Sequence, residues 1–263
     1  MSRKAKLAER IIYASKATKI AKVSRLGIVV SAVLTFLVFA VSYYGEVVGN
    51  FTFRVDRKDY EAGISLVRDP ETQQYTSRLV AERVESADGM TAFCGTDLSD
   101  YPIGNKVCIP SDQEIASKYG SNNGDSYLAY TFTLANAGVR VVDLEGKINI
   151  ISTTRGADES IRVRLIVNGI GTTYAKVQST NPRSDNPGMP EPYTQPFSGQ
   201  YEVMKEVFPA FDVGETVTIS VLIWYEGEDA DHNNDIIGGG VKLEMVFHVT
   251  YIYEDDEVPT QTT

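Results

Sequence analysis

The sequence predicts an all-β fold: a β-sandwich of jelly-roll or immunoglobulin-like type, preceded by one N-terminal transmembrane helix. Three observations lead to this prediction. Residues 26–44 form an uncharged apolar run. After residue 50, apolar and polar residues alternate with a period of two in segments rich in β-branched and aromatic residues. These segments are separated by turn signals at the spacing of a sandwich, without a long amphipathic helical pattern.

The run LGIVVSAVLTFLVFAVSYY at residues 26–44 predicts a signal-anchor helix. A helix of this length measures ~28 Å, close to the ~30 Å hydrocarbon core of a bilayer. Residues 1–25 hold eight basic residues and one acidic residue, so the positive-inside rule places this basic segment in the cytoplasm. The helix would then anchor an extracytoplasmic body, with the lipid bilayer as its first partner.

A cleaved secretory signal is the alternative to an anchor. Ala40-Val41-Ser42 offers small residues at the −3 and −1 positions of a signal-peptidase site, so cleavage near Ser42 would release the body. Both alternatives place the predicted sandwich domain, residues 45–253, outside the cytoplasm. Residues 254–263 are acidic and then polar, which predicts a flexible tail.

The charge of the chain limits the classes of partner. After residue 25 it holds 17 basic and 34 acidic residues. A surface of that sign disfavours the phosphate backbone of nucleic acids, so we expect no nucleic-acid partner.

Only two cysteines occur, Cys94 and Cys108. Outside the cytoplasm they are permitted to form a disulfide. The bond would close a loop of about 15 residues and contribute ~3 kcal/mol in the chain-entropy model. Two free thiols are the alternative, and a zinc site is disfavoured because no histidines lie nearby at metal-ligand spacing.

The body contains ten segments with strand character. Asn168-Gly169 predicts a two-residue hairpin turn, because both residues tolerate positive φ. Residues 215–227 are apolar on one face and partly apolar on the other, which predicts a central strand with Trp224 in the core. A short helix is expected over residues 113–120. The ten segments are 50–56, 63–69, 76–84, 127–136, 139–152, 161–169, 171–178, 201–208, 215–227 and 240–253.

Residues 181–196 depart from the strand pattern, with five prolines among 16 residues. Proline lacks the amide that a central strand needs, so this segment predicts a long exposed loop. Its functional interpretation is a partner-binding loop. The alternative is a plain connection between strands.

The motifs of common enzymes are missing from the sequence. It has two histidines, His232 and His248, and contains no HExxH zinc motif, no GxSxG elbow and no phosphate loop. Pairs of carboxylates are expected by chance in a chain with 35 acidic residues. We therefore expect a protein that is not an enzyme.

The segment after residue 225 is the best candidate site. Asp229, Asp231, Asn233 and Asp235 place oxygen-bearing side chains at every second position, a pattern that converges hard ligands on Ca²⁺. The pattern is not an EF-hand, because Asn234 stands at the sixth position, where that motif needs glycine, and the twelfth position is Gly240. Glu226 and Glu228 are candidates to complete the site. The alternative is an acidic turn, since Asp and Asn are common turn formers.

The layout resembles that of uncharacterised membrane-anchored secreted β-sandwich proteins of low-GC Gram-positive bacteria. The resemblance rests on SYLAYTFTLANAG at 126–138, IRVRLIVNGIGTTYAKV at 161–177 and the tryptophan-bearing acidic strand–loop–strand at 223–247. More distantly, the chain is similar to the TasA/camelysin group of biofilm matrix proteins. That resemblance implies a jelly-roll-like sandwich. It also implies assembly by donation of an N-terminal strand, for which the candidate residues are Phe51, Phe53 and Val55.

Together these features predict a single-pass cell-surface protein with a structural or adhesive role, of which a role in a matrix is one form. Its expected partners are an unknown surface protein or glycan, and self-association is a further expectation. The alternative is a calcium-dependent glycan-binding module that uses residues 226–235.

Overall fold

The computed structural model describes residues 27–37, 51–72, 74–86, 88–91 and 108–254. The chain divides into two compact units, residues 1–48 and residues 49–263.

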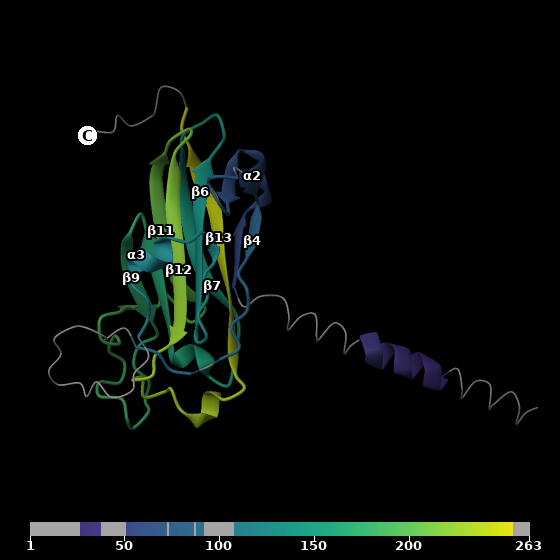
Figure 1. Ribbon diagram of the computed structural model, residues 1–263, viewed down its shortest axis with the longest axis vertical. Coiled ribbons are helices and arrows are strands. Elements are labelled where there is room, and N and C mark those ends of the chain that lie inside the picture. The colour runs from purple at the N-terminus through teal and green to yellow at the C-terminus, as the bar shows by residue number, and fades with distance from the viewer. Residues whose placement is uncertain (1–26, 38–50, 73, 87, 92–107, 255–263) are drawn as a thin grey trace, which may run out of the picture. The chain divides into compact units, whose positions relative to one another are not determined.

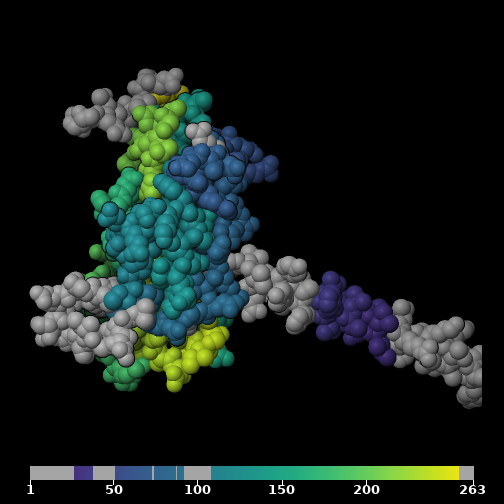
Figure 2. Space-filling model, viewed as in Figure 1, coloured from purple at the N-terminus to yellow at the C-terminus, as the bar shows by residue number. Residues whose placement is uncertain are grey.

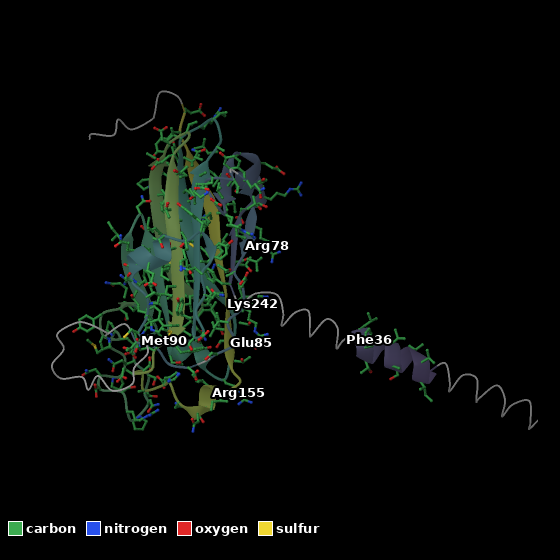
Figure 3. All side chains as sticks on the ribbon, viewed as in Figure 1. Phe36, Arg78, Glu85, Met90, Arg155 and Lys242 are labelled. Carbon is green, nitrogen blue, oxygen red and sulfur yellow. The ribbon has the colours of Figure 1, made fainter. Side chains whose placement is uncertain are left out.

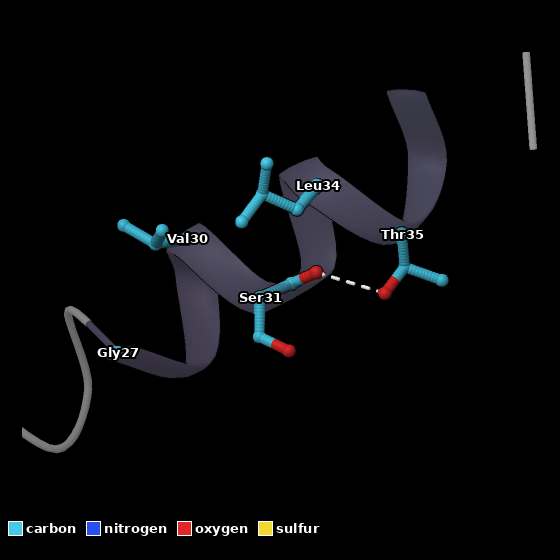
Figure 4. A pocket seen from close by; sticks show the side chains of 5 residues that line it. All are labelled: Gly27, Val30, Ser31, Leu34 and Thr35. Carbon is cyan, nitrogen blue, oxygen red and sulfur yellow. Dashed lines mark hydrogen bonds between the residues drawn. The ribbon is translucent and has the colours of Figure 1, made fainter. Parts of the chain in front are cut away.

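In the first unit the described residues 27–37 form an α-helix. The Thr35 hydroxyl donates to the Ser31 carbonyl oxygen at 2.9 Å, next to the apolar side chains of Val30 and Leu34 (Figure 4). None of the helices within the described ranges combines the length and the apolar character that a membrane crossing requires. The other residues of the predicted 26–44 helix lie outside the described part of the chain.

The second unit contains two mixed β-sheets (Figure 1). The smaller sheet places β1 between β13 and β4, parallel to β13 and antiparallel to β4. Its five strands, in spatial order, are β11 (Glu202–Phe211), β7 (Val142–Thr154), β13 (Gly240–Ile252), β1 (Phe51–Val55) and β4 (Arg78–Val80).

The larger sheet has eight strands, and β12 lies at its centre between β8 and β6. This position confirms the central strand predicted from residues 215–227. In spatial order the sheet runs β10 (Gln195–Pro196), β9 (Ile170–Ala175), β8 (Ile161–Val167), β12 (Thr216–Tyr225), β6 (Tyr127–Asn136), β2 (Ile64–Val67) and β3 (Tyr75–Thr76), while β5 (Gly120–Ser121) pairs with β6.

Aromatic contacts join the two sheets across one core. The ring of Phe53 on β1 lies 4.7 Å from that of Phe132 and 4.9 Å from that of Tyr130, both on β6. Phe132 also meets Phe247 on β13 at 6.0 Å. Because these rings come from different sheets and are fully buried, the inward faces of the sheets pack against each other. The all-β prediction is confirmed at this level.

A second apolar cluster covers the outer face of the larger sheet, where Trp224 and Leu222 pack with Ile115 of α3 (Asp112–Ala116). Arg164 on β8 holds α3 in place, because it donates to both carboxylate oxygens of Asp112 at 2.6 Å. Trp224 is therefore a core residue, as predicted, but it lies outside the space between the sheets.

Asn136, at the end of β6, organises the turns at one end of the unit. Its buried amide donates to the carbonyl oxygens of Arg140 and Phe211, each at 2.9 Å, and accepts from the Gly138 amide at 3.0 Å. A Cβ atom at Gly138 would lie 2.3 Å from the Ala62 carbonyl oxygen, so this position requires glycine. These contacts explain the Asn-Ala-Gly sequence at the end of the segment 126–138.

Local boundaries differ from the prediction in several places. The helix predicted over residues 113–120 is α3, which ends at Ala116, and the last two residues of the predicted loop 181–196 form β10. The predicted strand 76–84 is replaced by β3 and β4, because the chain passes between the sheets at Ser77, whose carbonyl accepts from Val55. Residues 57–61 form a short helix, α2 (Arg57–Glu61), which the sequence pattern did not indicate. The Asp59 carboxylate in that helix accepts from the Val249 amide at 3.0 Å, a tertiary contact.

The substitution Phe53→Ala tests the contribution of β1 to the core. It removes a fully buried ring that contacts both sheets, and we expect a loss of about 3–5 kcal/mol in unfolding free energy. The measurement is denaturant unfolding of the purified full chain. Tyr75→Ala is the control, because that ring is half exposed on edge strand β3. Equal losses for the two variants would contradict a core role for β1.

Candidate functional site

Two long loops lie together at one end of the second unit. The acidic loop (residues 226–239) joins β12 to β13, and the proline-rich loop (residues 181–194) precedes β10. Asn181 and Arg183 of the proline-rich loop both donate to the Ala230 carbonyl oxygen of the acidic loop, at 3.0 and 2.6 Å. Figure 2 shows the acidic loop in yellow at one end of the unit. The loops form a single surface.

Both ends of the acidic loop are fastened to neighbouring segments. The Met90 amide donates to the Tyr225 carbonyl at 2.8 Å, and the Gly227 amide donates to the Met90 carbonyl at 2.9 Å. At the other end Arg155 donates to the Ile237 carbonyl at 2.7 Å. Figure 3 labels Met90 and Arg155 at this end of the unit. These contacts restrict the loop's path between the two strands.

The buried side chain of Arg162 connects the two loops. It stands on β8 directly opposite Trp224, and its side chain is only 4% exposed. Its guanidinium pairs with the fully buried carboxylate of Asp229 in the acidic loop at 2.8 Å. The same guanidinium lies 3.4 Å from the carboxylate of Glu191 in the proline-rich loop. One guanidinium therefore lies between carboxyl groups of both loops, and its shorter contact is with Asp229.

A third carboxylate, that of Glu226, lies beside this pair. Glu226 is buried and accepts from the indole nitrogen of Trp224 at 3.1 Å. Together Arg162, Glu191, Glu226 and Asp229 line a polar cavity of about 70 Å³. Buried carboxylates here outnumber the buried guanidinium, so the site carries excess negative charge.

Burial and the excess of carboxylates both raise the pKa of Glu191. Burial raises the pKa of Glu191 to about 7, and the nearby carboxylates of Asp229, Asp231 and Glu226 act in the same direction. The guanidinium of Arg162 opposes the increase. The carboxyl group therefore changes its charge near neutral pH.

Three of the four predicted calcium ligands have protein partners for their side chains in the structure, and Asp235 is exposed. Asp229 pairs with Arg162 and accepts from the Asp231 amide at 2.8 Å. Asp231 accepts from the Asn181 side chain at 3.2 Å. Asn233 accepts from the Asp235 amide at 2.8 Å and begins the 3₁₀ turn η2 (Asn234–Ile236). Within the described ranges, no group of three or more His, Cys, Asp or Glu side chains is arranged to hold a metal ion. The calcium site stays a prediction.

The other predicted site residues lie elsewhere. Phe51, Phe53 and Val55 are buried in β1 within the chain's own sheet, and their donation to another copy stays a prediction. Cys108 is exposed and disulfide-bonded. Cys94 lies outside the described residues, so its pairing with Cys108 stays a prediction.

Sequence reasoning missed Arg162 and Glu191. The signal in the sequence is an arginine at an outward position of a strand otherwise rich in apolar residues, since Ile161, Val163 and Leu165 face the core. An arginine in such a strand needs a carboxylate partner. The partner was not identifiable, because the loops that supply it are distant in sequence.

Comparisons with known proteins found no relative. No protein-family model matches the chain, and no curated protein or solved structure matches it. Any functional inference must therefore rest on the chain's own residues.

The substitution Arg162→Ala tests the link between the loops. It leaves the buried Asp229 carboxylate without its cation, so we expect a loss of about 3–5 kcal/mol in unfolding free energy. Denaturant unfolding measures this loss. The control is Arg57→Ala, which breaks an exposed pair with Glu61 on α2 and should cost less than about 1 kcal/mol. Similar small losses in both variants would contradict the assigned role of Arg162.

Thermal melting in excess calcium and then in EDTA tests the calcium prediction. Because Asp229, Asp231 and Asn233 already have protein partners, we expect the two melting curves to coincide. A specific calcium site would instead raise the melting temperature by roughly 5 °C at saturating ion. Such a shift, lost in Asp231→Ala, would establish the metal site and overturn our expectation.

Proposed function

We propose that the chain is a single-pass bacterial surface protein whose extracytoplasmic β-sandwich acts by structural or adhesive contact. In this proposal the helix at residues 26–44 is the anchor, residues 1–25 are cytoplasmic, and the body is a jelly-roll or immunoglobulin-like sandwich. Support for the anchor comes from the sequence: an uncharged run of spanning length with basic residues on its N-terminal side.

The interaction role is supported by the surface that the acidic loop and the proline-rich loop form together. Loops supported by a rigid sheet are common binding elements, because the sheet fixes their position. Here three large apolar side chains are exposed beside the acidic residues: Met189 at 58%, Tyr193 at 76% and Ile237 at 62%. Aromatic and methionine side chains surrounded by polar groups are typical of interface centres. We therefore assign the contact surface to this end.

Self-association through β1 is a second form of the same proposal. The strand lies at the beginning of the second unit and pairs on both sides. If the equivalent strand of another copy replaced it, every pairing with β13 and β4 would be preserved, as in domain swapping. This form agrees with the matrix role that the TasA/camelysin resemblance implies.

A cell-based adhesion assay tests the proposed contact surface. The full chain is expressed in a bacterium, and surface exposure of the body is checked by protease treatment of intact cells. We expect cell–cell or cell–surface adhesion to fall severalfold in the double variant Met189→Ala, Tyr193→Ala, because both exposed side chains lie on the proposed surface.

The matched control for this assay is Val139→Ala with Val213→Ala. These valines are also exposed, but they lie in the turns at the opposite end of β6 and β12. Equal adhesion in the two double variants would contradict the placement of the surface. A body protected from protease in intact cells would contradict the topology.

A further inference from the structure

The contact between the two loops depends on groups whose charges do not balance. Glu191 of the proline-rich loop faces Arg162 of β8. It also faces Asp229, Asp231 and Glu226 of the acidic loop. Glu228 of the acidic loop and Arg183 and Asp185 of the proline-rich loop line the same cavity. Around Glu191 there are therefore two guanidinium groups and five other carboxylates.

The buried guanidinium of Arg162 is already paired with Asp229. Arg162 lies closer to Asp229, at 2.8 Å, than to Glu191, at 3.4 Å. The guanidinium of Arg183 donates to the Ala230 carbonyl oxygen. An ionised Glu191 would therefore share one cation with Asp229 and lie near several other carboxylates. Its side chain is mostly buried, so water screens the repulsion between these carboxylates only weakly.

We propose that the proline-rich loop is a pH-dependent latch, docked on the acidic loop when Glu191 is neutral and released when Glu191 is ionised. The inference rests on the proposed function, because it describes regulation of the same contact surface. It adds that the arrangement of Met189 and Tyr193, which lie on either side of Glu191 in sequence, changes with the pH outside the cell.

The direction of the effect follows from proton linkage. In the docked loop the pKa of Glu191 is about 7, whereas a solvated glutamate has the ordinary value of 4.5. The docked state therefore binds a proton that the released state loses between these two pH values. The free energy of docking is greatest below this interval, declines as pH rises through it, and reaches its minimum above about pH 7.

Hydrogen exchange of the purified full chain, followed by mass spectrometry, tests the latch. We compare peptides that cover residues 181–194 at about pH 5.5 and about pH 8, after correction for intrinsic exchange rates. The expected result is that the opening equilibrium of this loop rises about tenfold or more at the higher pH. Peptides from β6 serve as the internal reference and should not change in the same way.

Two variants identify the responsible group. Glu191→Gln keeps the shape of the side chain but cannot ionise, so its loop should show the protected pattern at both pH values. Asp235→Asn removes an exposed carboxylate of the acidic loop that lies outside the set of groups around Glu191 and should keep the wild-type pH dependence. The β6 peptides show whether each variant remains folded.

Either of two results would overturn the inference: equal protection of the wild-type loop at both pH values, or the same pH dependence in Glu191→Gln as in wild type. These results concern the loop alone. A pH-independent loop would therefore reject the latch even if the adhesion assay succeeds, and a pH-dependent loop would support the latch even if adhesion is unaffected by Met189 and Tyr193.

Discussion

The charge of Arg162 determines how one end of this fold is built. A guanidinium removed from water costs several kcal/mol unless a carboxylate and hydrogen-bond partners replace the solvent. Its position on the sheet, opposite Trp224 and beneath the loops, leaves the loops to supply that carboxylate. Asp229 of the acidic loop does so at 2.8 Å, while the carboxyl group of Glu191 in the proline-rich loop lies farther away, at 3.4 Å. Groups from two connections that differ in composition and length are thereby brought to one guanidinium.

The strands provide the rigid support on which this electrostatic arrangement depends. Phe53 of β1 contacts rings of the opposite sheet, so the first strand of the unit closes the core between β13 and β4. At the far end, Asn136 satisfies three backbone groups from two different turns, which fixes the connections there through hydrogen bonds. The two ends therefore follow different principles: hydrogen bonds to backbone at one, shared buried charge at the other.

Local pattern was sufficient to predict most of the strands and insufficient to predict the site. The segment 127–136 is β6, and the Asn168-Gly169 turn has positive φ at both residues, as the hairpin prediction requires. These features depend on neighbours in sequence. The helix α2 and the break between β3 and β4 depend on tertiary contacts, and the pattern missed them. The alternating oxygens of the acidic loop predict a metal site, which stays a prediction, and the same pattern did not indicate that Asp229 pairs with a buried arginine.

The same comparison shows why buried and exposed charges at similar distances have different consequences. Arg57 and Glu61 are 3.0 Å apart but largely exposed, so water and salt weaken their attraction. Arg162 and Asp229 are 2.8 Å apart with almost no exposure, so their attraction persists and so does the cost of any unmatched charge beside them. Glu191 occupies that unmatched position. A loop that depends on such a residue can be held firmly by the sheet and still respond to a single proton, because the responsive group is separate from the pair that provides the anchoring.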